Sequence, residues 1–249
     1  MRLRQRLGME WLAVAVLASC LVATLAYWNS LAQFDNLIYD QLSRIDPPPP
    51  RPEILIVAID EDSLAAFGQW PWSRQRHATL FKQLALGNPA AIGFDILLSE
   101  PGDPDDDAAL AQAMTGLPNL VLPLHFILPG SNGAEYDVKH PVAPFAEAAA
   151  GLGHVNLVFD RDGVVRRAAL CFGDKASGTD WPHLMEVIYR SVEGRPSSAY
   201  QRLADCNQTL LMPFTRRGAY QSISYAALAS GQVPRAFLNN RIILVGATA

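Results

Sequence analysis

The sequence predicts an α/β domain with a central, mostly parallel sheet flanked by helices and a β-hairpin in its second half, preceded by one N-terminal transmembrane helix. Three observations predict this architecture. From Glu53 onward, short apolar runs alternate with stretches of helical periodicity, as in parallel strands joined by crossover helices. Residues 11–28 carry no charge and predict the membrane-spanning helix. The proline-rich segment 46–52, DPPPPRP, separates the two parts because it cannot continue a helix.

The N-terminal segment Trp11–Trp28 has the length and apolarity of a membrane-spanning helix, with aromatic residues at both ends. Arginines precede it at positions 2, 4 and 6, so the positive-inside rule places residues 1–10 in the cytoplasm and the main domain outside the bacterial inner membrane, in the periplasm. A cleaved signal peptide is the alternative. The apolar run is longer than a typical signal core, and bulky Tyr27 and Trp28 follow the small residues that cleavage requires, so an uncleaved anchor is favoured.

Residues 29–45 are predicted to form a helical stalk between the membrane and the proline spacer. Apolar side chains recur there at steps of three and four residues, which is the spacing of one helix face: Leu31, Phe34, Leu37, Ile38, Leu42 and Ile45. Such a face favours pairing with a second copy of the chain, so a homodimer through the stalk is expected.

The domain over residues 53–249 begins with three predicted strands separated by helices. Continuous apolar runs indicate buried strands at Ile54–Ile59, Ala90–Leu98 and Leu120–Leu128. Helical periodicity follows the first at Arg74–Leu86, and a helix over 103–114 follows the second, with acidic residues in its first turn.

The second half of the domain changes character. Val155–Phe159 and Val164–Phe172 read as a hairpin around the turn Asp160–Gly163. Beyond it the pattern predicts helices at Trp181–Val192 and Ser222–Ala229. It also predicts strands at Thr209–Phe214 and Arg241–Val245.

Composition excludes some functions and leaves others open. The net charge of −4 and the absence of a basic stripe argue against a nucleic-acid partner. Cys171 and Cys206 could form one disulfide if the domain is exported, but their spacing does not decide it. The sequence lacks the paired cysteine and histidine spacings of a zinc site, and no cofactor is predicted.

Two carboxylates stand out as possible metal ligands. Asp60 and Asp95 come at or near the carboxyl ends of predicted parallel strands, the edge of an α/β sheet where ligands bind. Together they could hold Mg²⁺ in a metal-dependent phosphohydrolase. The competing interpretation is structural: Asp62 caps a short helix and Asp60 accepts hydrogen bonds from the turn. No lysine stands where such a phosphatase would need one.

Other catalytic signals are lacking in the sequence. It contains no Gly-x-Ser-x-Gly frame around a serine, no phosphate-binding glycine loop, and no regular spacing among its histidines. The chain is therefore not expected to be an enzyme. The structural or interaction module remains a further alternative.

The segment WPWSR, residues 70–74, is the most distinctive stretch. Pro71 fixes the backbone between two indoles, and Arg74 follows at the start of a helix, so the corner could form an aromatic wall with a cation. Alternatively the indoles close the core and Arg74 pairs with one of the aspartates at 60, 62 or 95. The candidate ligand corner comprises Asp60, Asp62, Ser63, Trp70, Pro71, Trp72, Arg74, His77 and Asp95.

Several separated motifs occur in an order typical of one family. They are VAIDEDSLAAFGQWPWSRQRHATLFKQL, AAIGFDILLSE, DRDGVVRRAAL and SYAALASGQVP, followed by LNNRIILVGATA. From about Phe34 to Ala249 the sequence resembles the type-two CHASE domain, an extracytoplasmic sensory module of bacterial signalling receptors.

The resemblance implies a sensor that detects a small-molecule or protein stimulus. In such receptors further membrane helices and a cytoplasmic output follow the domain, namely an adenylate or diguanylate cyclase, a histidine kinase or a serine/threonine kinase, so this chain is expected to stop short of them. By position, the family's signature residues fall on Asp60, Ser63, Gly68, Trp70, Pro71, Arg74, His77, Asp95, Asp162, Gly163, Arg166, Gly246 and Ala247.

Overall fold

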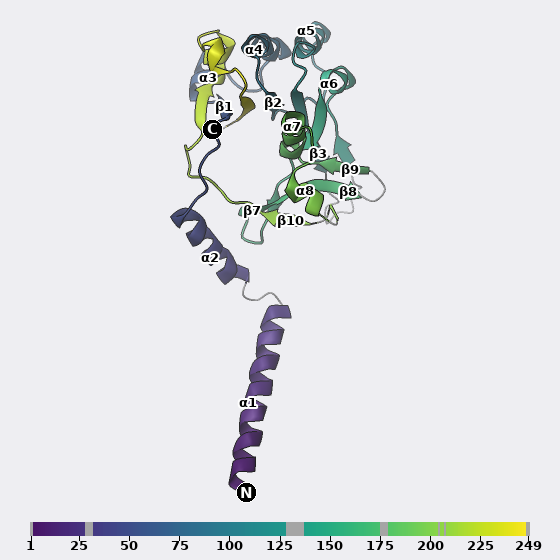
Figure 1. Cartoon of the computed structure of the whole chain (residues 1–249). Helices are drawn as coiled ribbons and strands as arrows, with labels where there is room; N and C mark the ends of the chain where they lie inside the picture. The colour runs from purple at the N-terminus through teal and green to yellow at the C-terminus, as the bar shows by residue number, and fades with distance from the viewer. Residues whose placement is uncertain are drawn as a thin grey trace. The chain divides into compact units, whose positions relative to one another are not determined.

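The computed structural model of the chain describes residues 2–27, 32–127, 137–174, 179–203, 205–206 and 208–247. The chain divides into two compact units, shown in Figure 1. The smaller comprises Met1–Pro48 with Pro213–Arg216, and the larger comprises Pro49–Met212 with Arg217–Ala249. Of the predicted elements, Trp28, residues 29–31 and Leu128 lie outside the described residues.

The smaller unit is helical. Helix α1 covers Arg2–Tyr27 and helix α2 covers Ala32–Ile45. Asp35 lies in the first turn of α2 and Arg44 in its last, so both charges complement the helix dipole. Among the described residues, no helix combines the length and the apolarity that a membrane crossing requires.

The larger unit is built on a mixed sheet that confirms the α/β prediction. Within the described residues it contains seven strands, with the path β11-β1-β12-β2-β3-β4 and with β5 also pairing β3. All pairings are parallel except that of β4 with β3. The strands are β1 (Ile54–Ile59), β2 (Ala91–Phe94), β3 (Leu120–Ile127), β4 (Asp137–Lys139), β5 (Gly151–His154), β11 (Gln221–Ser224) and β12 (Ile242–Ala247).

Helices cover the sheet and bury its apolar side chains. The main core lies under α3 (Glu61–Phe67), α4 (Arg74–Gly87), α5 (Pro104–Met114), α6 (Ala143–Ala148) and α9 (Tyr225–Ala229), with the 3₁₀ turn Arg235–Phe237 beside α4. Figure 1 shows α4, α5 and α6 as a row along the sheet. A separate small core, of Ala91, Val121, Leu184 and Ile188, lies under α7 (Leu184–Glu193).

Glycines let α7 approach its part of the sheet closely. A Cβ atom at Gly153 would lie 2.6 Å from Leu184 Cα, and one at Gly93 would lie 2.5 Å from Ile188 Cδ1. Real Cβ atoms do not approach other atoms so closely, so a side chain at Gly153 would push the backbone of α7 away, whereas one at Gly93 would displace the Ile188 side chain.

Smaller sheets complete the unit. The predicted hairpin is present as β6 (Val158–Phe159) and β7 (Val165–Ala169), and β10 (Thr209–Leu211) adds to it. A second hairpin joins β8 (Cys171–Asp174) to β9 (Thr179–Pro182), and the short helix α8 covers Ser198–Arg202. Cys171 and Cys206 form a disulfide bond, which is buried with Tyr200 and Leu203.

Several predicted boundaries were wrong, for identifiable reasons. The strand predicted over Ala90–Leu98 covers only Ala91–Phe94, and the apolar residues Ile96 and Leu98 after it are buried in the main core. The helix predicted from Trp181 begins at Leu184, because Trp181 lies in β9. The first three residues of the helix predicted over Ser222–Ala229 belong to β11, and the helix begins at Tyr225. Strand β5 was not predicted, since two of its four residues are glycines and carry no apolar signal.

Candidate functional site

The corner that follows β1 is organised by the side chain of Asp60. This carboxylate caps α3 by accepting a hydrogen bond of 2.9 Å from the backbone N–H of Ser63. The hydroxyls of Ser63 and Ser224 donate to the same oxygen, at 2.5 Å and 2.9 Å. Ser63 Oγ also accepts from the N–H of Ala226 at 3.1 Å. The network therefore joins the start of α3 to the start of α9.

The electrostatics of Asp60 agree with this structural role. Burial alone would raise its pKa, but the hydrogen bonds from Ser63 and Ser224 outweigh that effect and the pKa of Asp60 lies below its ordinary value. Asp62 was predicted to cap the helix, which is wrong. It lies exposed in the first turn of α3, where its charge faces the positive end of the helix dipole.

The two indoles of WPWSR have different environments. Trp72 is 6% exposed, its Nε1 donates to the carbonyl of Gly68 at 2.9 Å, and its ring packs on Phe67 and Tyr225. Trp70 is 37% exposed and meets the rings of Trp72 and His77 edge to face. The peptide bond between Trp70 and Pro71 is cis. Trp72 therefore belongs to the core, whereas Trp70 offers a face to solvent.

His77 joins α4 to α9 through a buried hydrogen bond. Its Nδ1 lies 2.7 Å from the hydroxyl of Tyr225. Burial, and then the nearby Arg74 guanidinium, lower the pKa of His77 to about 4, so the ring is neutral at pH 7. Burial also raises the pKa of Tyr225 above its ordinary value. The pair is thus an uncharged contact within the aromatic cluster.

Arg74 pairs with a partner that was not predicted. Its Nε lies 3.4 Å from Asp107 Oδ1, and its Nη2 donates to the carbonyl of Glu100 at 3.0 Å. The expectation that Arg74 pairs with Asp60, Asp62 or Asp95 is therefore wrong. Asp107 lies in the acidic first turn of α5, which packs against α4, so the pair joins the N-terminal ends of two neighbouring helices.

Asp95 lies at the carboxyl end of β2, as predicted. Its backbone N–H continues the ladder by donating to the carbonyl of Val245 at 2.8 Å. Within the described part of the chain, no hydrogen bond reaches its carboxylate. Partial burial raises the pKa of Asp95 above its ordinary value, although the residue is exposed to solvent.

A pocket of about 410 Å³ lies at the carboxyl edge of the sheet. It lies where β1, β12, β2 and β5 end, the edge at which α/β sheets bind ligands. Of the nine predicted corner residues, six line the pocket: Trp70, Pro71, Trp72, Arg74, His77 and Asp95. Asp60, Asp62 and Ser63 are not among the lining residues, so Asp60 and Asp95 do not line the same pocket.

Sequence reasoning missed the pocket residues contributed by other strand ends. These are Ile59, Ile96, Leu97, Val155 and Ala247. The predicted end of β1 pointed to the same edge, but Val155 follows the unpredicted strand β5. Tyr225, Ser224 and Asp107 carried no local signal, because each acts through a contact distant in sequence.

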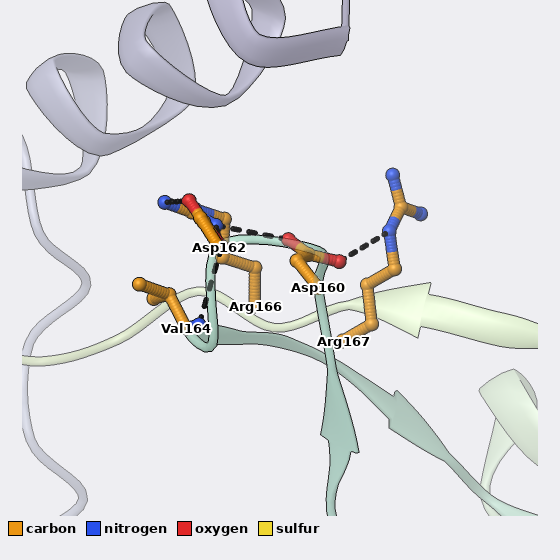
Figure 2. Close-up of polar contacts among 5 residues, drawn as sticks. All are labelled: Asp160, Asp162, Val164, Arg166 and Arg167. Atoms are coloured by element: carbon orange, nitrogen blue, oxygen red, sulfur yellow. Dashed lines mark hydrogen bonds and ion pairs between the residues drawn. The ribbon is translucent and has the colours of Figure 1, made fainter.

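A second polar site closes the hairpin between β6 and β7, shown in Figure 2. Arg166, only 4% exposed, donates from Nη1 to Asp160 Oδ2 at 3.0 Å and from Nη2 to Asp162 Oδ2 at 2.9 Å. The Arg166 hydrogen bond, with one from the N–H of Val164, keeps the pKa of Asp162 below its ordinary value. Gly163 has φ of 77° in the turn, a conformation that favours glycine. The signature residues of this motif are therefore architectural.

No cluster of three or more metal-ligating side chains occurs among the described residues. The pocket's one carboxylate, Asp95, has no second acidic group beside it in the lining. The arrangement can bind a small molecule through aromatic faces and one charge, and it offers no aligned nucleophile and base.

Comparison with known proteins agrees with this interpretation. The CHASE2 domain model matches residues 14–249, nearly the whole chain. No curated protein and no solved structure matches it. Because the family model spans far more than half of the sequence, and its members are extracytoplasmic sensory domains, the chain belongs to the CHASE2 domain family.

Proposed function

We propose that the chain is the sensory part of a membrane-anchored bacterial receptor and that it detects a small ligand in the pocket formed by Trp70, Arg74, His77 and Asp95. The observation that carries the proposal is the position of the pocket. It lies at the carboxyl edge of the parallel sheet, in a member of a family of extracytoplasmic sensory domains.

The buried disulfide supports an extracytoplasmic position for the main domain. Disulfides persist in the periplasm and are rare in the cytoplasm, where thiols are kept reduced. Cys171 and Cys206 are both almost fully buried, so their bond is protected from soluble reductants.

The membrane anchor in this proposal is the uncharged segment 11–28, oriented by the arginines before it. A test is to fuse alkaline phosphatase, which is active only outside the cytoplasm, either to residue 249 or to residue 10. We expect activity from the first fusion alone. Activity from neither fusion, with both proteins produced, would contradict an exported domain.

The stalk supplies a route for the signal. On α2, Phe34, Leu37, Ile38, Leu42 and Ile45 are all exposed by 59% or more, which suits pairing with the same helix of a second copy. Ligand binding would shift the population between arrangements of the paired stalks and so control a cyclase or kinase output.

The phosphohydrolase alternative has less support. It required Asp60 and Asp95 to act together, but one oxygen of Asp60 already accepts three hydrogen bonds that hold α3 and α9. It predicts Mg²⁺-dependent release of nitrophenol from p-nitrophenyl phosphate, lost in Asp95→Asn.

The sensory proposal is tested by a thermal-shift screen of the full chain, in mild detergent, against a library of periplasmic metabolites. A ligand of the folded state raises the melting temperature by mass action. We expect at least one compound to do so in the wild type and in Asp62→Asn, whose carboxylate is exposed on α3 outside the pocket lining. The shift should be absent in Trp70→Ala, provided that this variant melts normally without ligand. Shifts that survive Trp70→Ala and Asp95→Asn would place the ligand elsewhere, and turnover of p-nitrophenyl phosphate would replace the sensor by an enzyme.

A further inference from the structure

The charges around the pocket do not cancel. Arg74 is neutralised by Asp107, 3.4 Å away, and its Nη2 is already bonded to the carbonyl of Glu100. Its guanidinium also lies 5.9 Å from the centre of the Phe145 ring. These contacts hold the Arg74 side chain against α5, although it still lines the pocket. His77 is neutral at pH 7 and bonded to Tyr225.

In the part of the chain that the structure describes, the carboxylate of Asp95 is the charge of the pocket lining that has no partner of opposite charge. It is the acidic residue of the lining, and within the described residues its carboxylate receives no hydrogen bond. Asp95 is exposed at the rim of the pocket, and a carboxylate without a donor leaves its hydrogen-bonding capacity for a ligand. The site therefore has a net charge of about −1 at neutral pH.

The surface beside the pocket adds to the negative potential. A second hollow of about 400 Å³ shares Pro71, Trp72, Arg74 and Leu97 with the pocket. Its further lining includes three acidic residues: Glu100, Asp103 and Asp106. A cation approaching this edge is attracted, whereas an anion is repelled.

The rest of the wall is apolar and aromatic. Trp70 presents an indole that is 37% exposed, and Leu97 is 44% exposed. Ile96 and Val155 lie deeper in the lining. An indole face attracts a cation as well as an apolar ring, so Trp70 suits both ends of an amphiphilic amine.

We infer that the pocket binds a small organic cation, a protonated amine carried on an apolar or aromatic body, with the ammonium on Asp95 and the body against Trp70 and Leu97. The inference rests on the proposed function for the pocket itself and adds the chemical class of its ligand. Ligands that carry only a carboxylate or phosphate group are disfavoured, because the one cation of the lining is already paired with Asp107.

The test compares three probes of similar size and shape: 2-phenylethylamine, 2-phenylethanol and 3-phenylpropanoate. Their dissociation constants are measured by calorimetry on the full chain in lipid nanodiscs, with Asp95→Asn and Asp62→Asn alongside. Because both variants use the same nanodiscs, partition of a probe into lipid cancels in the comparison. Asp62 is a matched control, since it is an exposed carboxylate outside the lining.

In the wild type and in Asp62→Asn the amine should bind about fivefold more tightly than the alcohol, as expected for an ion pair with a solvent-accessible carboxylate. In Asp95→Asn the two should bind within about twofold of each other. Trp70→Ala should weaken the binding of both the amine and the alcohol, and the ratio of their dissociation constants should remain that of the wild type.

Three results would overturn the inference. Equal affinity of amine and alcohol in the wild type removes the role of Asp95. A preference for the amine that persists in Asp95→Asn places the cation elsewhere. Tighter binding of 3-phenylpropanoate, lost in Arg74→Gln, means that the pocket takes anions; that result refutes the ligand class while leaving a sensory pocket in place. The phosphatase fusions and the thermal-shift screen test the proposed function itself, independently of the ligand class.

Discussion

Replacing His154 by phenylalanine should make the protein more resistant to acid. The imidazole of His154 has no exposed surface, and within the described residues neither ring nitrogen has a hydrogen-bond partner. Its ring is surrounded by those of Phe126, Phe172 and His183, with centroid distances of 6.0, 4.6 and 4.9 Å. Burial, and then the charge of His183, lower the pKa of His154 to about 3.

The size of the effect follows from proton linkage. Between the unfolded pKa of 6.5 and the folded pKa of about 3, the unfolded chain binds a proton at this position and the folded protein does not. Acid therefore favours unfolding throughout that window, and the stability contributed by the neutral ring is complete only above pH 6.5. Since pH 5 lies about 1.5 pH units below the ordinary value, the wild type should lose about 2 kcal/mol through His154 between pH 7 and pH 5.

The measurement is urea unfolding of the full chain in mild detergent at pH 7, 6 and 5, followed by tryptophan fluorescence. Other groups titrate in both proteins, His77 among them, so the useful quantity is the difference between His154→Phe and the wild type. That difference should grow by about 2 kcal/mol in favour of the variant as the pH falls from 7 to 5. His140→Gln is the control, because His140 lies exposed and its replacement should leave the wild-type dependence in place. Parallel pH curves for wild type and His154→Phe would refute the reasoning.

Three other perturbations give separable outcomes. Arg166→Met leaves Asp160 and Asp162 facing each other without their shared cation and should cost about 3 kcal/mol of unfolding free energy in urea, whereas exposed Arg161→Met should cost less than about 0.5 kcal/mol; equal effects would contradict the described hairpin. Gly153→Ala places a methyl group 2.6 Å from Leu184 Cα and should cost about 1–3 kcal/mol, whereas Gly116→Ala, whose nearest contact is 3.5 Å, should be tolerated; a stable Gly153→Ala in the same assay would show that α7 is not held so closely. Replacing both Cys171 and Cys206 by alanine opens a loop spanning 35 residues and should cost about 4 kcal/mol, measured as a lower urea midpoint; a midpoint equal to that of the wild type would mean that the bond is not formed.

The elements that could be predicted from the sequence are those whose signal is local. Strand β1 lies at Ile54–Ile59 as expected, because a continuous apolar run of this length suits a strand buried on both faces. Helix α4 begins at Arg74 and α5 follows its acidic cap, Asp103. The hairpin around Asp160–Gly163 was also predicted correctly, since its turn residues permit few alternatives.

The remainder depended on contacts between distant segments. Strand β5 contains two glycines and has no apolar periodicity. Its glycines are explained by the close packing of helix α7 on it. Likewise the sequence does not reveal which acid neutralises Arg74, because Asp107 is brought to it by the packing of two helices. Six of the nine predicted corner residues line one pocket because the strand-end rule identified the correct edge. Of the other three, Asp60 and Ser63 join α3 to α9, and Asp62 lies exposed on α3.

The pairing of β1 with β12 has a mechanical consequence. The chain enters the domain at Ile54 and the final described strand ends at Ala247, and the two strands run parallel in register from Ile54 with Ile242 to Ile59 with Ala247. Tension applied at the start of β1 and at the end of β12 therefore pulls the two strands past each other lengthwise. Every rung of the ladder is loaded at once in shear, so the domain should resist stretching until the whole ladder fails together. A domain joined to its surroundings through these two strands transmits force with little extension. The pocket, which is lined by Ile59 and Ala247, lies at the carboxyl end of this strand pair.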